Sequence, residues 1–257
     1  MRLALYQAPS PAGDIPAGLD VVQQSLMQAA SDGIEMLVLP ELFLPGYRAV
    51  STIPPTGWKD VEPRLSDLCR TSGVGLTIGV PEYQDDKIYN TALALDPRGH
   101  VLARHRKIQL FGDYEAGIFA SGECYTTFDF GNRRFGLLIC YDAEFPEHVR
   151  ALARLDCDVI LVPTANMMPY INVNTVMIPA RAAENAVTVV YANLCGTEGD
   201  LTYVGQSGIF GPDGYSIATK GQSPGLAIAE LPDETWSEHD LPHTTQLKDL
   251  RHVKDGL

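Results

Sequence analysis

Three residues that can take part in hydrolytic chemistry stand at or beside the ends of apolar segments. Cys140 closes the apolar run 135–140 and is followed by polar and aromatic residues, and Glu41 closes the run 37–41. Lys107 stands beside an apolar residue in a third segment. A thiol held at the end of a buried strand is well placed to act as a nucleophile. The chain order of carboxylate, ammonium and thiol therefore suggests a Cys–Glu–Lys hydrolase.

The thiol needs help from its neighbours, because a free cysteine with a pKa of about 8.5 is mostly protonated at neutral pH. We expect Glu41 to accept the proton of Cys140, and Lys107 to stabilise the thiolate and then the oxyanion. The backbone N–H of Tyr141 is a second candidate oxyanion donor. After attack on a carbonyl or nitrile carbon, the substrate nitrogen would leave as ammonia or an amine to give a thioester, which water activated by Glu41 would hydrolyse.

Each of these residues also has a structural interpretation. A cysteine at the end of an apolar strand is usually a small core residue. A glutamate after a strand and a lysine in a hairpin strand usually face solvent. Periodicity along the chain does not show that the three side chains meet in space.

The elements that must position these residues alternate between strands and helices, with hairpins between them. This alternation favours a layered α/β fold in which helices cover mixed sheets, formed by one domain over residues 1–257. We expect 232–257 to be a polar C-terminal tail that reaches a subunit interface. The predicted strands are 3–8, 36–39, 74–80, 88–95, 101–107, 134–139, 159–163, 187–193, 206–210, 215–219 and 226–231. The predicted helices are 17–32, 62–72, 146–155 and 175–186.

Composition limits the classes of partner and compartment. The net charge of −13 over 257 residues argues against non-specific binding to nucleic acid or to an anionic membrane surface. Residues 1–7 are typical of a first strand rather than a signal peptide, and no apolar stretch reaches membrane-spanning length. The five cysteines are widely spaced without a Cys-x-x-Cys pair. We expect a cytoplasmic protein with no metal and no cofactor.

Three segments resemble the signature blocks of the nitrilase superfamily of carbon–nitrogen hydrolases. They are 39–47, 106–115 and 138–147, and they occur in the order and at the spacing of that family. With the flanking elements, the likeness covers the chain from residue 3 to about residue 231. The resemblance implies a four-layer αββα sandwich. It also implies that two or more copies pair across a helical face into a homodimer or a higher homo-oligomer.

The resemblance assigns a role to four residues. It implies that Glu41 is the general base, Lys107 the oxyanion stabiliser and Cys140 the nucleophile. It further implies that Glu115 helps to position the substrate nitrogen and holds the lysine. The structural alternative for Glu115 is a carboxylate on the surface of a loop.

Five other residues are candidates for binding the substrate. Tyr47 follows the first block, and Tyr141 and Phe145 flank the nucleophile. Asn166 and Met167 follow the predicted strand 159–163, where loops commonly line sites. The alternative for the methionine is that it fills the core or a dimer contact.

The favoured function is an amidase that hydrolyses a small carboxamide to an acid and ammonia. Cys140 is followed by Tyr-Asp and then by Phe-Pro-Glu, which resembles amidase and carbamoylase members, whereas nitrilases more often carry Trp-Glu. The alternatives are N-carbamoyl amide hydrolysis, ω-amidase action and nitrile hydrolysis. A carbamoylase or ω-amidase needs a cation for the substrate carboxylate, and Arg48 and Arg181 are the candidates. A non-catalytic binding member of the family is the remaining alternative.

Overall fold

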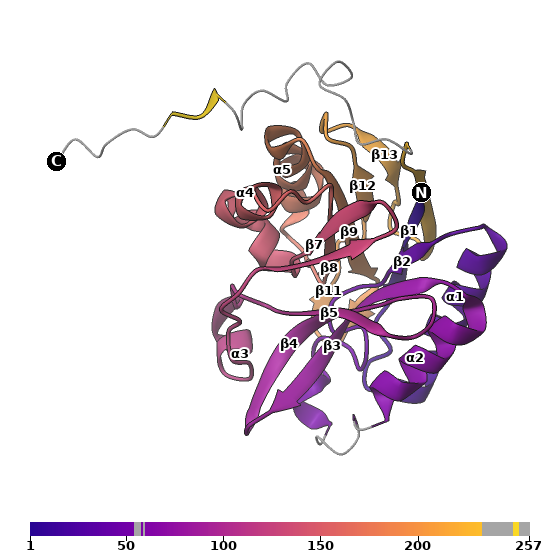
Figure 1. Ribbon diagram of the computed structural model, residues 1–257. Helices are drawn as coiled ribbons and strands as arrows, with labels where there is room; N and C mark the ends of the chain where they lie inside the picture. The colour runs from indigo at the N-terminus through magenta and orange to yellow at the C-terminus, as the bar shows by residue number, and fades with distance from the viewer. Residues whose placement is uncertain (54–57, 59, 233–248, 252–257) are drawn as a thin grey trace.

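The computed structural model describes residues 1–53, 58, 60–232 and 249–251. Its strands form two layers, and helices cover the outer face of each layer (Figure 1). The two layers meet at the first strand, because Leu3 to Leu5 pair with one layer whereas Ala8 and Pro9 pair with the other. The architecture is the αββα sandwich expected from the sequence.

The first layer contains both parallel and antiparallel strands. Its parallel strands share their direction with the N-terminal strand, which also pairs antiparallel with the last strand of the sheet. Helices α1 (Ile15–Ser31) and α2 (Val61–Ser72) cover its outer face. In order across the sheet, the strands are β14 (Gly225–Glu230), β1 (Arg2–Pro9), β2 (Met36–Val38), β3 (Gly75–Gln84), β4 (Lys87–Leu95) and β5 (Val101–Arg106).

The second layer repeats this mixture of parallel and antiparallel pairs. Helices α4 (Pro146–Ala153) and α5 (Ile178–Asn185) cover its outer face. Across the sheet the strands are β6 (Thr126–Phe130), β7 (Arg133–Leu137), β8 (Val159–Thr164), β9 (Thr188–Cys195), β12 (Gly208–Phe210) and β13 (Ser216–Thr219). The short strands β10 (Thr197–Glu198) and β11 (Leu201–Thr202) form a separate pair.

Alternation along each central strand divides the core into three layers. In β2, Met36 and Val38 face the other sheet, whereas Leu37 packs under the helices. In β8, Leu161 lies in the core between the sheets and Ile160 lies under α4 and α5. Strands buried on both faces must be apolar at successive positions, which explains the continuous apolar runs in the sequence.

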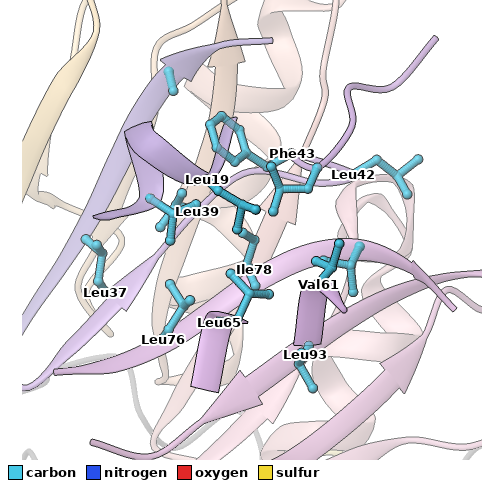
Figure 2. Packing of buried hydrophobic residues seen from close by; sticks show 14 of the residues in the cluster. Leu19, Leu37, Leu39, Leu42, Phe43, Val61, Leu65, Leu76, Ile78 and Leu93 are labelled. Carbon is cyan, nitrogen blue, oxygen red and sulfur yellow. The ribbon is translucent and has the colours of Figure 1, made fainter. Parts of the chain in front are cut away.

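Helix α1 shows how the outer layer is attached. The Asp14 side chain accepts a hydrogen bond from the backbone N–H of Ala17 at 2.9 Å and caps the helix N-terminus. Leu19 lies on the buried face of the helix and packs with Leu39 and Ile78 from the sheet (Figure 2). Full burial of such a side chain contributes about 1.5–3 kcal/mol, so this stripe holds the helix on the sheet.

The predicted strands and helices are present with small shifts of their ends. The predicted helix 175–186 begins as a π-helical turn, η4 (Val173–Met177), before α5. The edge strand β6 and the short helix α3 (Gly112–Ala116) were not predicted. The 3₁₀ turn η1 (Val50–Thr52) was not predicted either. Most of the tail predicted over 232–257 lies outside the described residues. No helix in the described ranges is long and apolar enough to cross a membrane.

The segment after β2 passes close to both sheets. A Cβ at Gly79 of β3 would lie 2.3 Å from the backbone nitrogen of Leu42 and 2.5 Å from the Cα of Glu41, so only glycine allows this approach. The N–H of Gly79 donates to the carbonyl of Pro40 at 3.0 Å, and the N–H of Glu41 donates to the carbonyl of Thr164 at 3.3 Å. Glu41 is therefore fixed between the end of β8 and the middle of β3.

Candidate active site

Cys140 occupies a sharp turn and not the end of a strand. Strand β7 stops at Leu137, and the 3₁₀ helix η3 (Cys140–Glu144) begins at the cysteine itself. The backbone of Cys140 has a φ of 44°, in the left-handed region that is unfavourable for residues other than glycine. Such strained conformations are retained where the surrounding structure holds a functional side chain in place. The turn leaves Cys140 partly exposed on the wall of a cavity.

A buried ammonium joins two buried carboxylates next to this turn. Lys107 Nζ lies 2.7 Å from Glu41 Oε1 and 2.7 Å from Glu115 Oε1, and all three side chains are fully buried. Both contacts are charge-assisted hydrogen bonds of the strong kind. An ammonium has three N–H donors, so Lys107 keeps one donor beyond these two bonds. The structural alternatives, in which Glu41, Lys107 and Glu115 face solvent, are wrong.

The backbone around Lys107 is tied to both neighbouring segments. Its N–H donates to the carbonyl of Asn90 in β4 at 2.8 Å, and its carbonyl accepts from the N–H of Gly122 at 2.7 Å. Glu115 lies on α3, where its second oxygen accepts from the N–H of Phe111 at 2.9 Å. The short helix therefore holds Glu115 against the lysine.

Glu41 has one occupied and one unoccupied oxygen. Oε1 accepts from Asn90 Nδ2 at 2.6 Å as well as from Lys107. Within the described part of the chain, Oε2 has no hydrogen-bond partner. A buried carboxylate oxygen without a donor is an acceptor available for a proton. Sequence reasoning missed Asn90, although an amide in the middle of an otherwise apolar strand was a usable signal.

Asp142 ties the cysteine turn to the lysine loop. Its Oδ1 accepts from the backbone N–H groups of Ile108 at 3.1 Å and Gln109 at 2.7 Å. Its Oδ2 accepts from the N–H of Ile139 at 3.0 Å and lies 3.3 Å from His105 Nε2. Both oxygens are thus occupied. Asp142 lies in the third signature block, 138–147, but its role could not be read from the sequence.

Burial and neighbouring charges set the protonation states. Burial raises the pKa of Glu41, and the charge of Lys107 only partly offsets that rise. Burial acts to lower the pKa of Lys107, but Glu41 and Glu115 outweigh it and hold that pKa above its usual value. Burial, with Glu41 adding to it, raises the pKa of Cys140 well above its usual value. The resting site therefore contains a neutral thiol, a charged lysine and a carboxylate of increased basicity.

A cavity of about 320 Å³ opens onto Cys140. Of the residues expected to bind the substrate, Tyr47, Tyr141, Asn166 and Met167 line it. Phe145 is not among the lining residues, since its ring packs edge-on against Tyr141 with the ring centroids 4.9 Å apart. The cavity is also lined by residues that the sequence did not single out, namely Phe111, Glu144, Ala165 and Tyr170. Phe111 and Glu144 lie within the second and third signature blocks, where they were given no role, and Ala165 and Tyr170 lie outside the blocks.

Hydrogen bonds to neighbouring residues fix the polar side chains that line the cavity. Tyr47 donates its hydroxyl hydrogen to Glu115 Oε1 at 2.7 Å. Asn166 Nδ2 donates to Asn174 Oδ1 at 2.6 Å and to the carbonyl of Tyr170 at 2.9 Å.

Two larger cavities, of about 550 and 740 Å³, open beside β3 to β5, and neither is lined by Glu41, Lys107, Glu115 or Cys140. Within the described ranges, no group of three or more His, Cys, Asp or Glu side chains is arranged to hold a metal ion.

The two arginines considered for binding a substrate carboxylate are engaged elsewhere. Arg48 Nη2 lies 3.3 Å from Asp200. Arg181 pairs with Glu184 at 3.0 Å and donates to the backbone carbonyl of Glu144 at 2.7 Å. Neither arginine lines the cavity.

The chain matches known proteins over nearly its whole length. The model of the carbon-nitrogen hydrolase family matches residues 2–239. A protein named "Hydrolase in pqqF 5'region" from Pseudomonas protegens is 40% identical over 93% of this chain and 85% of its own. An "(R)-stereoselective amidase" from a Pseudomonas species is 31% identical over 90% of this chain and 85% of its own.

A solved structure gives the same result in three dimensions. The crystal structure of an amidase from Nesterenkonia sp. is 35% identical, covers 98% of this chain and 93% of its own, and has a TM-score of 0.90. These matches confirm the resemblance to amidase-type members of the nitrilase superfamily that the three sequence blocks indicated. The chain belongs to the carbon–nitrogen hydrolase family.

Proposed function

We propose that this protein is an amidase that hydrolyses a small carboxamide to an acid and ammonia through a thioester on Cys140. The observation that carries the proposal is the arrangement around the thiol. Cys140 lies in the cavity wall, and the charges of Glu41 and Lys107 act on it. A nucleophile, a base and an oxyanion donor are the groups that acyl transfer requires.

The acylation step uses Oε2 of Glu41 as the proton acceptor and the third N–H of Lys107 as the oxyanion donor. As Cys140 Sγ forms a bond to the carbonyl carbon, its proton passes to Oε2 of Glu41, the oxygen without a partner. The carbonyl π electrons move to oxygen, where the third N–H of Lys107 and the backbone N–H of Tyr141 stabilise the negative charge. Glu41 then gives its proton to the amide nitrogen, the C–N bond breaks and ammonia leaves.

Deacylation uses the same carboxylate in reverse. Glu41 removes a proton from water, and the resulting hydroxide adds to the thioester carbon. The C–S bond then breaks, the carboxylic acid leaves, and the proton held by Glu41 returns to the sulfur of Cys140. Glu115 keeps Lys107 oriented throughout, because it occupies a second N–H of the ammonium.

The cavity residues give the proposed substrate its position. We assign Tyr47, Tyr141, Asn166 and Met167 to contact with the substrate, and Phe145 to support of the Tyr141 ring from behind. A volume of about 320 Å³ is at the lower end of small-molecule pockets and suits a short acyl chain.

Work on the relative from Nesterenkonia sp. AN1 supports a small carboxamide. A variant of that amidase with cysteine replaced by alanine has been solved in complex with butyramide. A second variant carries the acetamide moiety of fluoroacetamide, covalently added at its active-site cysteine. That amidase is 34–35% identical to this chain, and the same chemistry is proposed here.

Ammonia release from matched compounds tests the proposal. Butyramide, butyronitrile and N-carbamoyl-β-alanine differ in the bond that is cleaved, and Cys140→Ala is the control. We expect release from butyramide that disappears in Cys140→Ala while the circular dichroism spectrum stays unchanged. Release only from the nitrile or the carbamoyl compound would reassign the reaction. No release from any of them, with Cys140 no more reactive to iodoacetamide than the other thiols, would favour a binding member without catalysis.

A further inference from the structure

Three aromatic rings form a contiguous wall of the cavity that contains Cys140. The ring of Phe111 meets that of Tyr141 edge-on at a centroid distance of 5.2 Å, and that of Tyr170 at 5.8 Å. All three residues line the cavity. Because these rings stand at steep angles to one another, a ligand in the cavity meets aromatic surface from more than one direction. Such cages recognise ammonium groups, because a cation is attracted to the negative face of an aromatic ring.

A carboxylate without a cation of its own shares this cavity. Glu144 lines it and is half-buried. Among the described residues, none forms a salt bridge or hydrogen bond with its side chain, whereas Glu41 and Glu115 both bind Lys107. Arg181 pairs with Glu184 and donates to the backbone carbonyl of Glu144, not to its carboxylate.

The charge balance of the site favours a cationic ligand. Two carboxylates share the single ammonium of Lys107, which leaves a net negative charge before Glu144 is counted. No lysine or arginine is among the residues that line the cavity. Burial raises the pKa of Glu144, and the charges of Lys107 and Arg181 oppose the rise. A cation bound beside Glu144 would oppose it further and keep the carboxylate ionised.

We propose that Glu144 and the rings of Phe111, Tyr141 and Tyr170 form an acyl subsite for an ammonium group. The preferred substrates are then small carboxamides whose acyl chain carries a protonated amine. The same subsite rejects carboxamides with a terminal carboxylate, because their anion would lie beside Glu144 without a cation. This inference rests on the proposed amidase function and narrows its substrate class.

Three amides of matched shape test the subsite. Pentanamide, 4-aminobutyramide and glutaramate place a methyl, an ammonium or a carboxylate at the same position of the acyl chain. We expect kcat/KM for 4-aminobutyramide to exceed that for pentanamide by roughly tenfold, as a carboxylate and an aromatic cage together provide. Glutaramate should be the poorest of the three. Equal values for the cationic and neutral amides would overturn the subsite.

Variants assign the selectivity to particular side chains. Glu144→Gln keeps the shape and removes the charge, so it should lower the ratio of kcat/KM for 4-aminobutyramide to that for pentanamide by roughly fivefold, the larger part of the preference, and raise the relative rate with glutaramate. Tyr170→Leu should also lower the ratio, and Tyr170→Phe, which keeps the ring, should lower it less. Glu147→Gln removes a charge from an exposed residue three positions along and should leave the ratio unchanged.

Binding separates this inference from the proposed reaction. Cys140→Ala lacks the nucleophile, so titration calorimetry measures the affinity for each amide without turnover. Tighter binding of 4-aminobutyramide than of pentanamide, lost in Cys140→Ala/Glu144→Gln, supports the subsite even if wild type releases no ammonia from any amide. Equal affinity for the two amides contradicts the subsite, whereas turnover of pentanamide by wild type would still support the amidase.

Discussion

Two buried carboxylates stand in the turns that follow parallel strands, one in each sheet. Glu41 follows β2 and Asp142 follows β7, and neither is exposed. Asp142 has both oxygens occupied, by three backbone N–H groups and by the ring of His105. Glu41 has one oxygen occupied by Asn90 and Lys107, and in the described chain its other oxygen has no partner.

The difference separates a carboxylate that holds structure from one that is free to react. Both oxygens of Asp142 are used to fix the cysteine turn against the lysine loop, so this carboxylate has a structural role. Glu41 carries an oxygen to which no described residue donates, and its pKa is raised. A buried group left half-satisfied costs stability, and such a cost is typical of functional sites.

Glu41→Gln is the variant with the largest expected effect. It keeps the size of the side chain and removes the base, so both steps of the proposed reaction should slow, by about 10²–10⁴-fold in kcat/KM. Glutamine keeps an oxygen for Asn90 and Lys107, and burial already disfavours the charge that is removed, so the Tm should change little. Ammonia release and thermal unfolding measure the two effects. A variant that loses stability but keeps its rate would reverse the comparison with Asp142.

Asp142→Asn should show the opposite balance. An amide in place of the carboxylate keeps one oxygen for Ile108 and Gln109, but its NH₂ donor faces the backbone N–H of Ile139, so a charge-assisted bond worth about 1.5–3 kcal/mol is lost. The free energy of unfolding should fall by roughly 2–3 kcal/mol, with activity falling as the cysteine turn loosens. Urea titration measures the loss, and Asp20→Asn at an exposed position is the control. Unchanged stability would remove the structural role from Asp142.

Asn90→Ala tests the contribution of the hydrogen-bonded oxygen of Glu41. Removing the donor 2.6 Å from Oε1 leaves Lys107 as the one partner of that oxygen among the described residues. Loss of a hydrogen bond to a charged group should reorient the carboxylate and lower kcat/KM by about tenfold. Thr77→Ala, another buried polar position in the same sheet, is the matched control. Equal losses in both variants would indicate general destabilisation of the sheet.

The pH profile should reflect the raised pKa of Glu41. The base must be ionised, so the acid limb of kcat/KM for a neutral amide should have its midpoint above the ordinary carboxyl value of 4.5. Ionisation of Glu41 has opposite effects on activity and on folding stability. Since the folded pKa exceeds the unfolded one, the ionised carboxylate costs stability at higher pH, and this cost disappears as pH falls through the folded pKa. Full activity retained at pH 4.5 would contradict the raised pKa.

Strand and helix positions could be predicted because burial on both faces leaves a direct mark in the residue pattern. Strand β2 is apolar at every position for that reason, and the proposed base and nucleophile stand out where polar residues follow such runs. Strand β6 could not be predicted with the same ease, since it is an edge strand that carries the exposed Asp129. An edge strand has only one neighbour and needs less apolar surface.

The details of the site depend on contacts between distant segments. Asn90 meets Glu41 only because β4 pairs beside β3 and the β2 turn crosses close to Gly79. The turn at Cys140 follows from the bonds that Asp142 makes with a loop more than thirty residues away. Pairing of this kind leaves no periodic signal in a single sequence, so Cys140 could be singled out as the proposed nucleophile while its geometry and its neighbour Glu144 could not be predicted.

The pairing of β1 with β14 has a consequence for the order of assembly. These strands join the first described residues to residues 225–230, and the N–H of Leu231 donates to the carbonyl of Met1 at 2.8 Å. During synthesis, one edge of β1 therefore remains unpaired until the ribosome has released those late residues. An open edge invites pairing with other chains, so the nascent protein is exposed to aggregation at this edge until β14 pairs with β1.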